Sequence, residues 1–264
     1  MEVHHHPHIP THAKPWKEYL LEGLMIFVAV TLGYGAENVR EHYVETKKAL
    51  VSAKNLYVDV INDSIGYAKT RNNRNKQDSC FEIINAHYNN NELDKEIPAV
   101  YAAHAHITRR MLYQMNTLAL DEVKNSGTLK FLESDELKAA IQRYASQGIG
   151  LKLREQREFS YIDRMLDPIS INNFKFNFLR VAGDNFKIDS NKILITIPVP
   201  DNLKIIKKDQ LDWDNYIAIL GMLQTIREST NRSYILPSQK QCHELLTLLR
   251  NYLIKHDALE NNNH

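Results

Sequence analysis

The feature that most constrains this chain is an apolar run near its start, Leu20–Ala36. The run is 17 residues long and contains a single ionisable side chain, Glu22. An α-helix rises ~1.5 Å per residue, so a helix from Trp16 to Tyr34 spans ~27 Å, close to the ~30 Å hydrocarbon core of a bilayer. Both of these end residues are aromatic and favour the membrane interface. The sequence therefore predicts a transmembrane helix over residues 17–36.

Two other interpretations of this run stay open. A cleaved signal peptide would have a basic start and an apolar stretch of roughly 7–15 residues. The start here is rich in histidine and the stretch is longer, although Gly33, Gly35 and Ala36 resemble a cleavage site. A buried core helix is the other alternative, because the run is at the short limit for crossing a bilayer. The run is apolar on all sides, which favours lipid.

Three residues of the predicted membrane helix are candidates for helix pairing. Glu22 lies within a turn of the expected interface, where a carboxylate is tolerated at the boundary or acts as a titrating group. Ala29 and Gly33 form a small-xxx-small step that lets helices approach closely. Two interpretations stay open for these residues. They either mark an ordinary membrane boundary or form a face that pairs with another helix; the residues are Glu22, Ala29 and Gly33.

The first 16 residues read as a flexible tail that is rich in histidine and proline. Neutral imidazoles at this density bind Zn²⁺, Ni²⁺ or Cu²⁺ when these ions are present. Pro7 and Pro10 prevent a helix, so no fixed coordination geometry follows. The alternatives are a pH-dependent interfacial anchor and a tail without a specific ligand. The candidate metal ligands are His4, His5, His6, His8 and His12.

Composition excludes several classes of protein. The 264 residues are 43% hydrophobic and 25% charged, and the net charge of +1 indicates no nucleic-acid partner. The two cysteines, Cys80 and Cys242, are too few for a disulfide scaffold. They form either one bridge or, as we favour, two small buried residues. His104 and His106 stand two positions apart, so a helix points them to different faces, and a core histidine at 104 is the better interpretation.

Residues 37–168 predict a helical hairpin or bundle. The membrane helix continues into a weak coiled-coil or bundle seam of about four heptads. Two sets of residues alternate along it at heptad spacing: Tyr43, Leu50 and Tyr57, and Val39, Thr46, Ala53, Val60 and Tyr67. The polar stretch 71–79 is expected to break or expose the helix before a second helix over 80–87, and a third helix is expected from about Pro98 to near Ser126 and Gly127. A glycine then predicts a turn, and an N-cap residue predicts the start of the next helical region, which has two stretches. A proline predicts the end of that region. The residues that mark them are Ser126, Gly127, Ser134, Asp167 and Pro168.

The remainder of the chain divides into three parts. Residues 169–212 show period-two spacing at their phenylalanines and isoleucines, which predicts irregular structure or a short β-hairpin. Residues 213–257 predict two helices, the second of which begins at a Ser-x-x-Gln capping box, Ser238 to Gln241. Residues 258–264 read as a flexible tail.

The sequence contains none of the short motifs that mark common active sites. A glycine-rich phosphate loop, a Gly-x-Ser-x-Gly elbow, His-Glu-x-x-His and Cys-x-x-Cys are all missing. Glu155 and Glu158 share a helix face, and Arg109 and Arg110 are adjacent, but surface charge explains both patterns. We therefore predict no enzyme and no cofactor, apart from Zn²⁺ or another divalent transition metal on the histidine tail.

Two segments carry a resemblance to a known group of proteins. The apolar run, with Glu22 near its start and the Asn-x-x-Glu pattern of Asn38 and Glu41 after its end, resembles the N-terminus of a group of uncharacterised Bacteroidota single-pass membrane proteins. The segment 120–144, with Ser126 and Gly127, is similar to the Leu-Lys-Ser-Ser-Gly pattern of the same group. This resemblance implies a membrane anchor and a helical domain, and it implies no catalytic residue.

Taken together, the sequence predicts a mainly α protein with one transmembrane helix that continues into a helical bundle. We expect a single-pass protein of the inner (cytoplasmic) membrane with its C-terminal domain in the periplasm. Lys and Arg counts lean weakly toward a cytoplasmic domain, but a first apolar helix behind a short basic tail often inserts as a signal anchor. The expected partners are the bilayer and another protein or a second copy. The expected role is that of a scaffold, sensory or accessory subunit, with metal handling or a proton-linked role of Glu22 as the alternatives.

Overall fold

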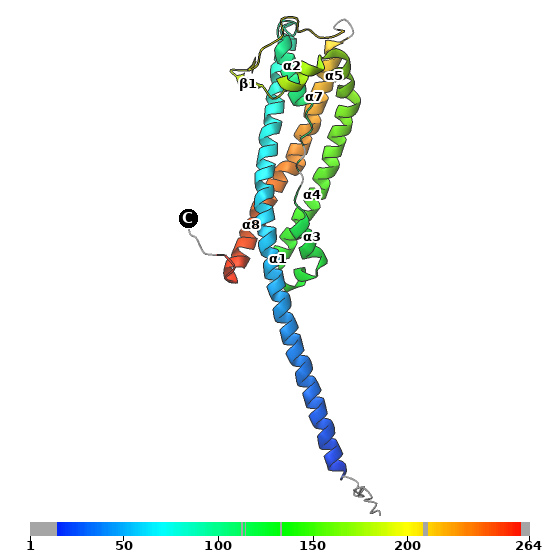
Figure 1. Ribbon diagram of the computed structural model, residues 1–264, viewed down its shortest axis with the longest axis vertical. Helices are drawn as coiled ribbons and strands as arrows, with labels where there is room; N and C mark the ends of the chain where they lie inside the picture. The colour runs from blue at the N-terminus through cyan, green and yellow to red at the C-terminus, as the bar shows by residue number, and fades with distance from the viewer. Residues whose placement is uncertain (1–14, 112, 114, 133, 208–210, 260–264) are drawn as a thin grey trace, which may run out of the picture.

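The computed structural model describes residues 15–111, 113, 115–132, 134–207 and 211–259. In this part the chain is mainly helical and carries one small antiparallel sheet, so the predicted fold class is confirmed. The longest element is α1, Trp16–Asn89, which runs unbroken for 74 residues. At ~1.5 Å per residue this helix is ~110 Å long. Its first third projects from one end of the bundle as a single rod (Figure 1).

The projecting part of α1 is the apolar run. Every residue from Trp16 to Val44 is exposed, and the first buried side chain of the helix is Ala49. Within the described residues, α1 is the one helix that is long and apolar enough to cross a membrane, and none of its apolar window is buried. The alternative of a buried core helix is therefore wrong for this run.

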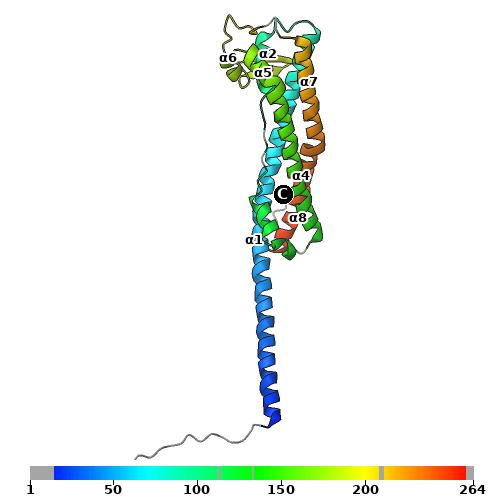
Figure 2. The same cartoon turned by 90° about the vertical axis from the view of Figure 1, so that its right-hand side faces the viewer.

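Three long helical columns form the bundle. The first is α1, the second is α4, Asp135–Tyr161, and the third joins α7, Trp213–Thr230, to α8, Leu236–Lys255. Helix α1 packs against α7 at the end far from the apolar run and against α8 at the near end, while α4 packs against both (Figures 1 and 2). The bundle therefore extends the line of the projecting helix.

The core-facing side of α1 follows a heptad pattern. Eleven of its fourteen buried residues recur at alternating steps of four and three, which keeps one stripe facing a neighbouring helix. These residues are Ala49, Ala53, Leu56, Val60, Asp63, Tyr67, Thr70, Arg74, Gln77, Phe81 and Ile84. The predicted seam positions Ala53, Val60 and Tyr67 are confirmed, but Val39 and Tyr43 are exposed and lie outside the seam, which begins at Ala49 and continues to Ile84.

The helix break predicted over residues 71–79 is wrong. Helix α1 passes through this stretch, and Arg74 and Gln77 point into the bundle. The expected separate helix over 80–87 is the last part of α1, which ends at Asn89. Asn91 follows with a positive φ of 57°.

The third predicted helix is shorter than expected. Helix α2 occupies Ile97–Ile107, and the described residues that follow, 108–111, 113 and 115–117, lead along the bundle without helical structure. We call this segment the strap. It leads into α3, Leu118–Asn125, which packs against α1.

The turn after α3 agrees with its sequence. Gly127 adopts φ 72°, a conformation that favours glycine, and starts the short helix η1, Thr128–Phe131. The side chain of Ser134 accepts a hydrogen bond from the Leu137 amide at 3.2 Å, so the predicted N-cap of α4 is confirmed.

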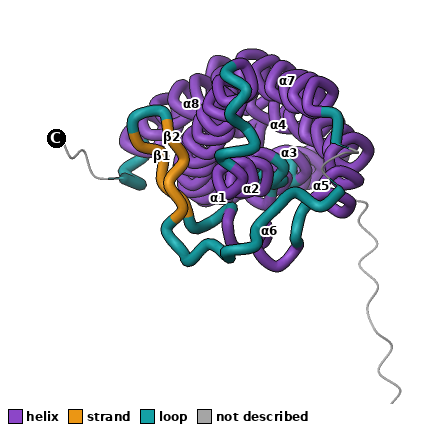
Figure 3. Tube along the Cα trace, turned by 90° about the horizontal axis from the view of Figure 1, so that it is seen from above, coloured by secondary structure: helices purple, strands orange, loops and turns teal. Residues whose placement is uncertain are grey.

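The segment between α4 and α7 lies at the far end of the bundle. A π-helical turn, η2 (Ile162–Leu166), continues α4 into α5 (Asp167–Asn173), and α6 (Phe176–Ala182) follows. Strands β1 (Phe186–Asp189) and β2 (Lys192–Ile195) form the predicted hairpin. Seen along the bundle axis, α6 and the hairpin lie outside the long helices (Figure 3).

The last two helices are joined without a break. A second π-helical turn, η4 (Asn231–Ile235), connects α7 to α8. Ser238 is buried inside α8 and does not cap it, so the predicted capping box is wrong. Pro237 lacks an N–H and crowds the carbonyl of the preceding turn, and it stands directly after η4, where the wider π-helical turn accommodates it.

Candidate functional site

The most unusual feature of the interior is a polar layer between two apolar cores. Four buried polar residues of α1 form one side of it: Asp63, Thr70, Arg74 and Gln77. The apolar cluster nearer the projecting helix includes Leu56 and Val60. The cluster at the far end begins with Cys80. We call the residues from Asp63 to Gln77 and the side chains that bind them the polar layer.

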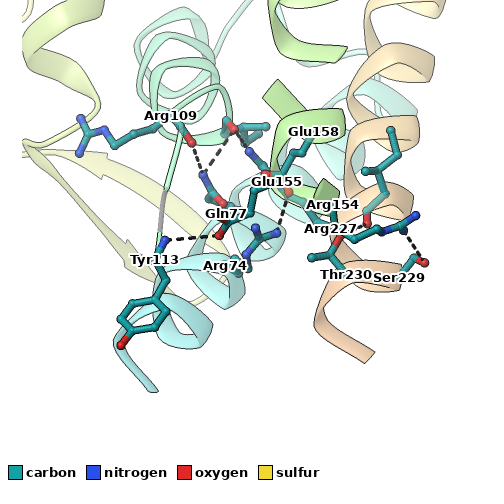
Figure 4. A network of polar contacts seen from close by, with 12 residues as sticks. Arg74, Gln77, Arg109, Tyr113, Arg154, Glu155, Glu158, Arg227, Ser229 and Thr230 are labelled. Carbon is teal, nitrogen blue, oxygen red and sulfur yellow. Dashed lines mark hydrogen bonds and ion pairs between the residues drawn. The ribbon is translucent and has the colours of Figure 1, made fainter. Parts of the chain in front are cut away.

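The centre of the polar layer is a buried carboxylate held by two guanidinium groups (Figure 4). Glu158 Oε2 accepts a hydrogen bond from Arg74 Nη1 at 2.8 Å, and its Oε1 accepts one from Arg227 Nε at 2.9 Å. Each of the three residues is at most 1% exposed. Burial lowers the pKa of Arg227, while the Glu158 carboxylate opposes that shift.

The two π-helical turns of the bundle stand next to this ion triad. Turn η2 begins four residues after Glu158, and η4 begins four residues after Arg227. Ile162 of η2 belongs to the far core and Ile235 of η4 to the near core. The turns therefore bracket the layer on adjacent columns. Such turns often mark places where a helix has adapted to a particular set of contacts.

The polar layer binds the backbone of the strap and of the end of α2. Gln77 Nε2 donates to the carbonyl oxygens of His106, at 2.9 Å, and Arg109, at 3.1 Å. Arg227 Nη2 donates to the Ile107 carbonyl at 2.6 Å. Because a buried backbone group without a partner is costly, these contacts explain why an extended segment can lie against the interior.

A buried glutamate continues the same role farther along the strap. Glu155 Oε1 accepts a hydrogen bond from the Tyr113 amide at 3.3 Å. The residue is 2% exposed. Burial raises the pKa of Glu155 to about 7. Glu155 and Glu158 share a helix face, as the sequence indicates, but the interpretation of that face as surface charge is wrong.

A second carboxylate, Asp63, anchors the lower part of the strap. The hydroxyl groups of Tyr113 and Tyr144 both donate to its oxygens, and the Asn116 amide donates at 3.2 Å. Burial raises the pKa of both tyrosines, so they remain protonated donors. Asp59 Oδ1 accepts from Asn116 Nδ2 at 2.7 Å.

This arrangement supports a structural role more than a catalytic one. The ion triad is sealed from solvent, so a dissolved substrate does not reach it. Arg74, Glu158 and Arg227 join three helical columns, and Arg227 also holds the Ile107 carbonyl, while Arg74 Nε and Nη2 have no hydrogen-bond partner in the part of the chain that the structure describes. Within the described residues, no group of His, Cys, Asp and Glu side chains is placed to hold a metal ion.

The pair His104 and Ser170 has the distance of a catalytic dyad but a different hydrogen-bond pattern. His104 Nε2 lies 2.7 Å from Ser170 Oγ, and its Nδ1 lies 3.0 Å from the Tyr216 hydroxyl. Ser170 Oγ donates to the Leu166 carbonyl at 3.0 Å. His104 therefore donates to Ser170 instead of accepting its proton. Burial lowers the pKa of His104 to about 3, which keeps the ring neutral.

The remaining histidine and cysteine predictions agree with the structure. His104 stacks on Phe174 at 4.2 Å between centroids, whereas His106 packs edge-on against Phe186, so the two imidazoles face different neighbours. Cys80 and Cys242 are free, fully buried, and lie in the two different apolar cores.

The predicted membrane-face residues all lie on the projecting part of α1. Glu22, Ala29 and Gly33 are exposed, and helical geometry of 100° per residue puts them within about 40° of one another around the axis. Their role stays a prediction. The candidate metal ligands lie outside the described residues; they are His4, His5, His6, His8 and His12.

Sequence reasoning missed the polar layer. The signal that could have found it is the heptad register, because Arg74 and Gln77 continue the steps of three and four that begin at Ala49. Comparisons of this chain with known protein families, with curated proteins and with solved structures found no match.

Proposed function

We propose that this protein is a single-pass membrane-anchored scaffold, sensory or accessory subunit that acts through contacts with another protein. The observation that carries the proposal is the continuity of α1, which joins an exposed apolar segment to the interior of the bundle in one helix of 74 residues. A position or tilt of the anchor is thereby coupled directly to the bundle. A bundle that shares one continuous helix with its membrane anchor is what we expect of a subunit in a larger membrane assembly.

The composition of the interior also supports a non-enzymatic role. Many buried polar groups of the polar layer bind one another or the strap, while Arg74 Nε, Arg74 Nη2 and Gln77 Oε1 have no hydrogen-bond partner among the described residues. The net charge of +1 gives no reason to expect a nucleic-acid partner. The proposed partners are therefore the bilayer and a protein.

The experiment that tests this proposal is in-cell crosslinking of the full-length protein in native membranes, followed by mass spectrometry. The expected result is a reproducible adduct between the bundle and one other protein. A protein that stays monomeric, without adducts on any face of its bundle, would contradict the proposal.

We further propose that the bundle lies on the periplasmic side of the inner membrane. Both native thiols are buried, so a cysteine placed at the exposed residue 72 reports topology alone. Asn72→Cys is expected to react with a membrane-impermeant maleimide in intact spheroplasts. Labelling only after lysis would place the bundle in the cytoplasm.

The alternative function, metal handling by the histidine tail, rests on the density of imidazoles in the first 12 residues. Titration of Zn²⁺ into the full chain and into a variant with alanine at the five tail histidines separates the two functions. Equal binding by both proteins would exclude the tail as a metal site. A proton-linked role of Glu22 would be excluded in the same way if Glu22→Gln left assembly and growth unchanged.

A further inference from the structure

The outer face of α1 carries a second heptad stripe that the fold leaves uncovered. Val44, Val51, Val58 and Ile65 follow one another at steps of seven residues. Their exposed fractions are 38%, 59%, 51% and 64%. All four side chains are β-branched, the type that favours the a position of two-stranded coiled coils.

This stripe is distinct from the buried seam. At 100° per residue, Val51 and Val58 lie roughly 180° around the helix from Ala53 and Val60. The buried seam is explained by packing against the rest of the bundle. From Val44 to Ile65 the stripe advances by three heptad steps, which corresponds to a rise of ~31 Å along the helix.

Basic side chains accompany the exposed stripe. Lys47 and Lys54 each stand three residues after a stripe valine, and Lys69 stands four residues after Ile65. All three are exposed, and in the described part of the chain no ion pair engages them. Lys47 lies over the Tyr43 ring, with its ammonium 4.6 Å from the centroid.

Three acidic groups beside the stripe have partners in the bundle. Glu45 pairs with Lys48 at 2.7 Å, Asp59 accepts from Asn116, and Glu122 Oε1 accepts from Ser52 at 2.8 Å. The stripe therefore presents an apolar line beside two lysines, Lys47 and Lys54, that no ion pair engages in the described part of the chain.

The near end of the stripe opens into a groove. Its α1 wall is formed by Val44, Val51 and the stems of two lysines, and its other wall includes Glu122 and Thr128. The groove lies just beyond the apolar run, where an approaching helix would leave the membrane beside α1.

Charge decides between two occupants of this face. Copies of a single-pass protein share one orientation, so a symmetric contact along the stripe would set two α1 helices parallel. That contact would bring Lys47 against its counterpart and Lys54 against its counterpart, and like charges at such positions are unfavourable. A helix with carboxylates at these positions would form pairs instead.

We propose that the stripe Val44–Ile65 is the docking surface for an amphipathic helix of a different protein, with apolar residues in heptads and carboxylates opposite Lys47 and Lys54. This inference rests on the proposed function and names the face and the chemistry of the partner. The partner helix runs along α1 for three heptads from the groove beside the membrane.

The first test uses the full-length protein in native membranes with a photoreactive benzoylphenylalanine at residue 51 or 58. Leu153 on α4 is a matched control position, because it is apolar and 63% exposed. The expected adduct forms from 51 and 58 but not from 153, and its crosslinked peptide is an acidic heptad segment of another protein. An adduct between two copies of this chain would overturn the inference.

Charge reversal provides the second readout. Lys47→Glu/Lys54→Glu is expected to reduce the adduct at least about tenfold, since two attractive exposed pairs become repulsive. The control Lys152→Glu/Arg157→Glu reverses two exposed charges on α4 and is expected to leave the adduct unchanged. Lys47→Arg/Lys54→Arg should retain it. Equal adducts from all these variants would overturn the inference.

A defined probe tests the chemistry directly. Two synthetic peptides of three heptads have Ile at a and Leu at d, with Glu at e and g in one and Lys in the other. The full-length protein in phosphatidylcholine nanodiscs is expected to bind the Glu peptide and not the Lys peptide. Binding of both would overturn the inference. Adducts from 153 without adducts from 51 and 58 would refute the docking face while leaving the proposed function standing, and no adduct from any position would refute both.

Discussion

Tyr113 of the strap packs so closely on Gly66 of α1 that a Cβ atom at residue 66 would lie 1.9 Å from the Tyr113 Cε2 atom. The strap therefore depends on a helix position that has no side chain. The same ring carries the hydroxyl that donates to Asp63, one helical turn earlier. Gly66 thus permits the contact that fixes the lower part of the strap.

The first prediction concerns this contact. Gly66→Ala should lower the free energy of unfolding by about 1–3 kcal/mol, because the displaced ring loses both its packing and its hydrogen bond to Asp63. Alanine would otherwise favour a helix by up to ~1 kcal/mol. Gly221→Ala is the matched control, since its Cβ would meet Phe81 at an ordinary 3.5 Å. Denaturant unfolding of the two variants should shift the midpoint in opposite directions, and equal stabilisation would contradict the account of the strap.

The second prediction concerns the ion triad. Glu158→Gln should lower the free energy of unfolding by roughly 3–5 kcal/mol, because it leaves two buried guanidinium groups without their carboxylate. Glu228→Gln removes an exposed pair with Arg232, whose side chains are 64% and 74% exposed, and should cost less than ~1 kcal/mol. Chemical denaturation of both variants measures the difference. Similar small losses would show that the triad contributes little to folding.

Local signals in the sequence predicted much of the fold. Ser134 caps its helix and Gly127 makes its turn through contacts with residues close in the chain. The apolar run and the hairpin depend on composition and period alone. Such features require no knowledge of distant partners.

The polar layer could not be predicted in this way. A polar run such as 71–79 usually indicates solvent, and only the pairing of Arg74 with Glu158, 84 residues away, explains its burial. Distant partners also explain why α2 ends at Ile107. Gln77 and Arg227 donate hydrogen bonds to the carbonyl oxygens of His106 and Ile107. A helix end that is fixed by residues far away in the sequence leaves no pattern in the neighbouring residues.

The third prediction concerns pH. Burial raises the pKa of Glu155 from 4.5 to about 7, so the folded protein holds a proton there that the unfolded chain releases. The resulting stability is fully present below pH ~4.5 and is lost as the pH rises through ~7. Relative to the wild type, Glu155→Gln should become progressively more stable between pH 5 and 8. Gln keeps an oxygen for the Tyr113 amide, so its own pH dependence is a suitable reference.

Unfolding curves of both proteins at several pH values test this prediction. Burial also raises the pKa of Asp78 to about 6. This group gives the free energy of unfolding a pH dependence of the same sign in both proteins, so its effect cancels when the two proteins are compared. His104 acts with the opposite sign, because burial depresses its pKa to about 3 and protonation in the unfolded chain lowers stability below pH ~6.5. A constant difference across the range would contradict the assignment to Glu155.

The fourth prediction concerns the thiols. Cys80 and Cys242 are both 0% exposed, and burial raises the pKa of each to about 12. Because the thiolate is the reactive form, both should resist alkylation in the native protein and react at once in concentrated guanidinium chloride. Asn72→Cys provides the exposed control and should be modified rapidly without denaturant. Labelling of the native wild type at the rate of residue 72 would show that the two apolar cores open readily, and would contradict a bundle that holds both cysteines in its interior.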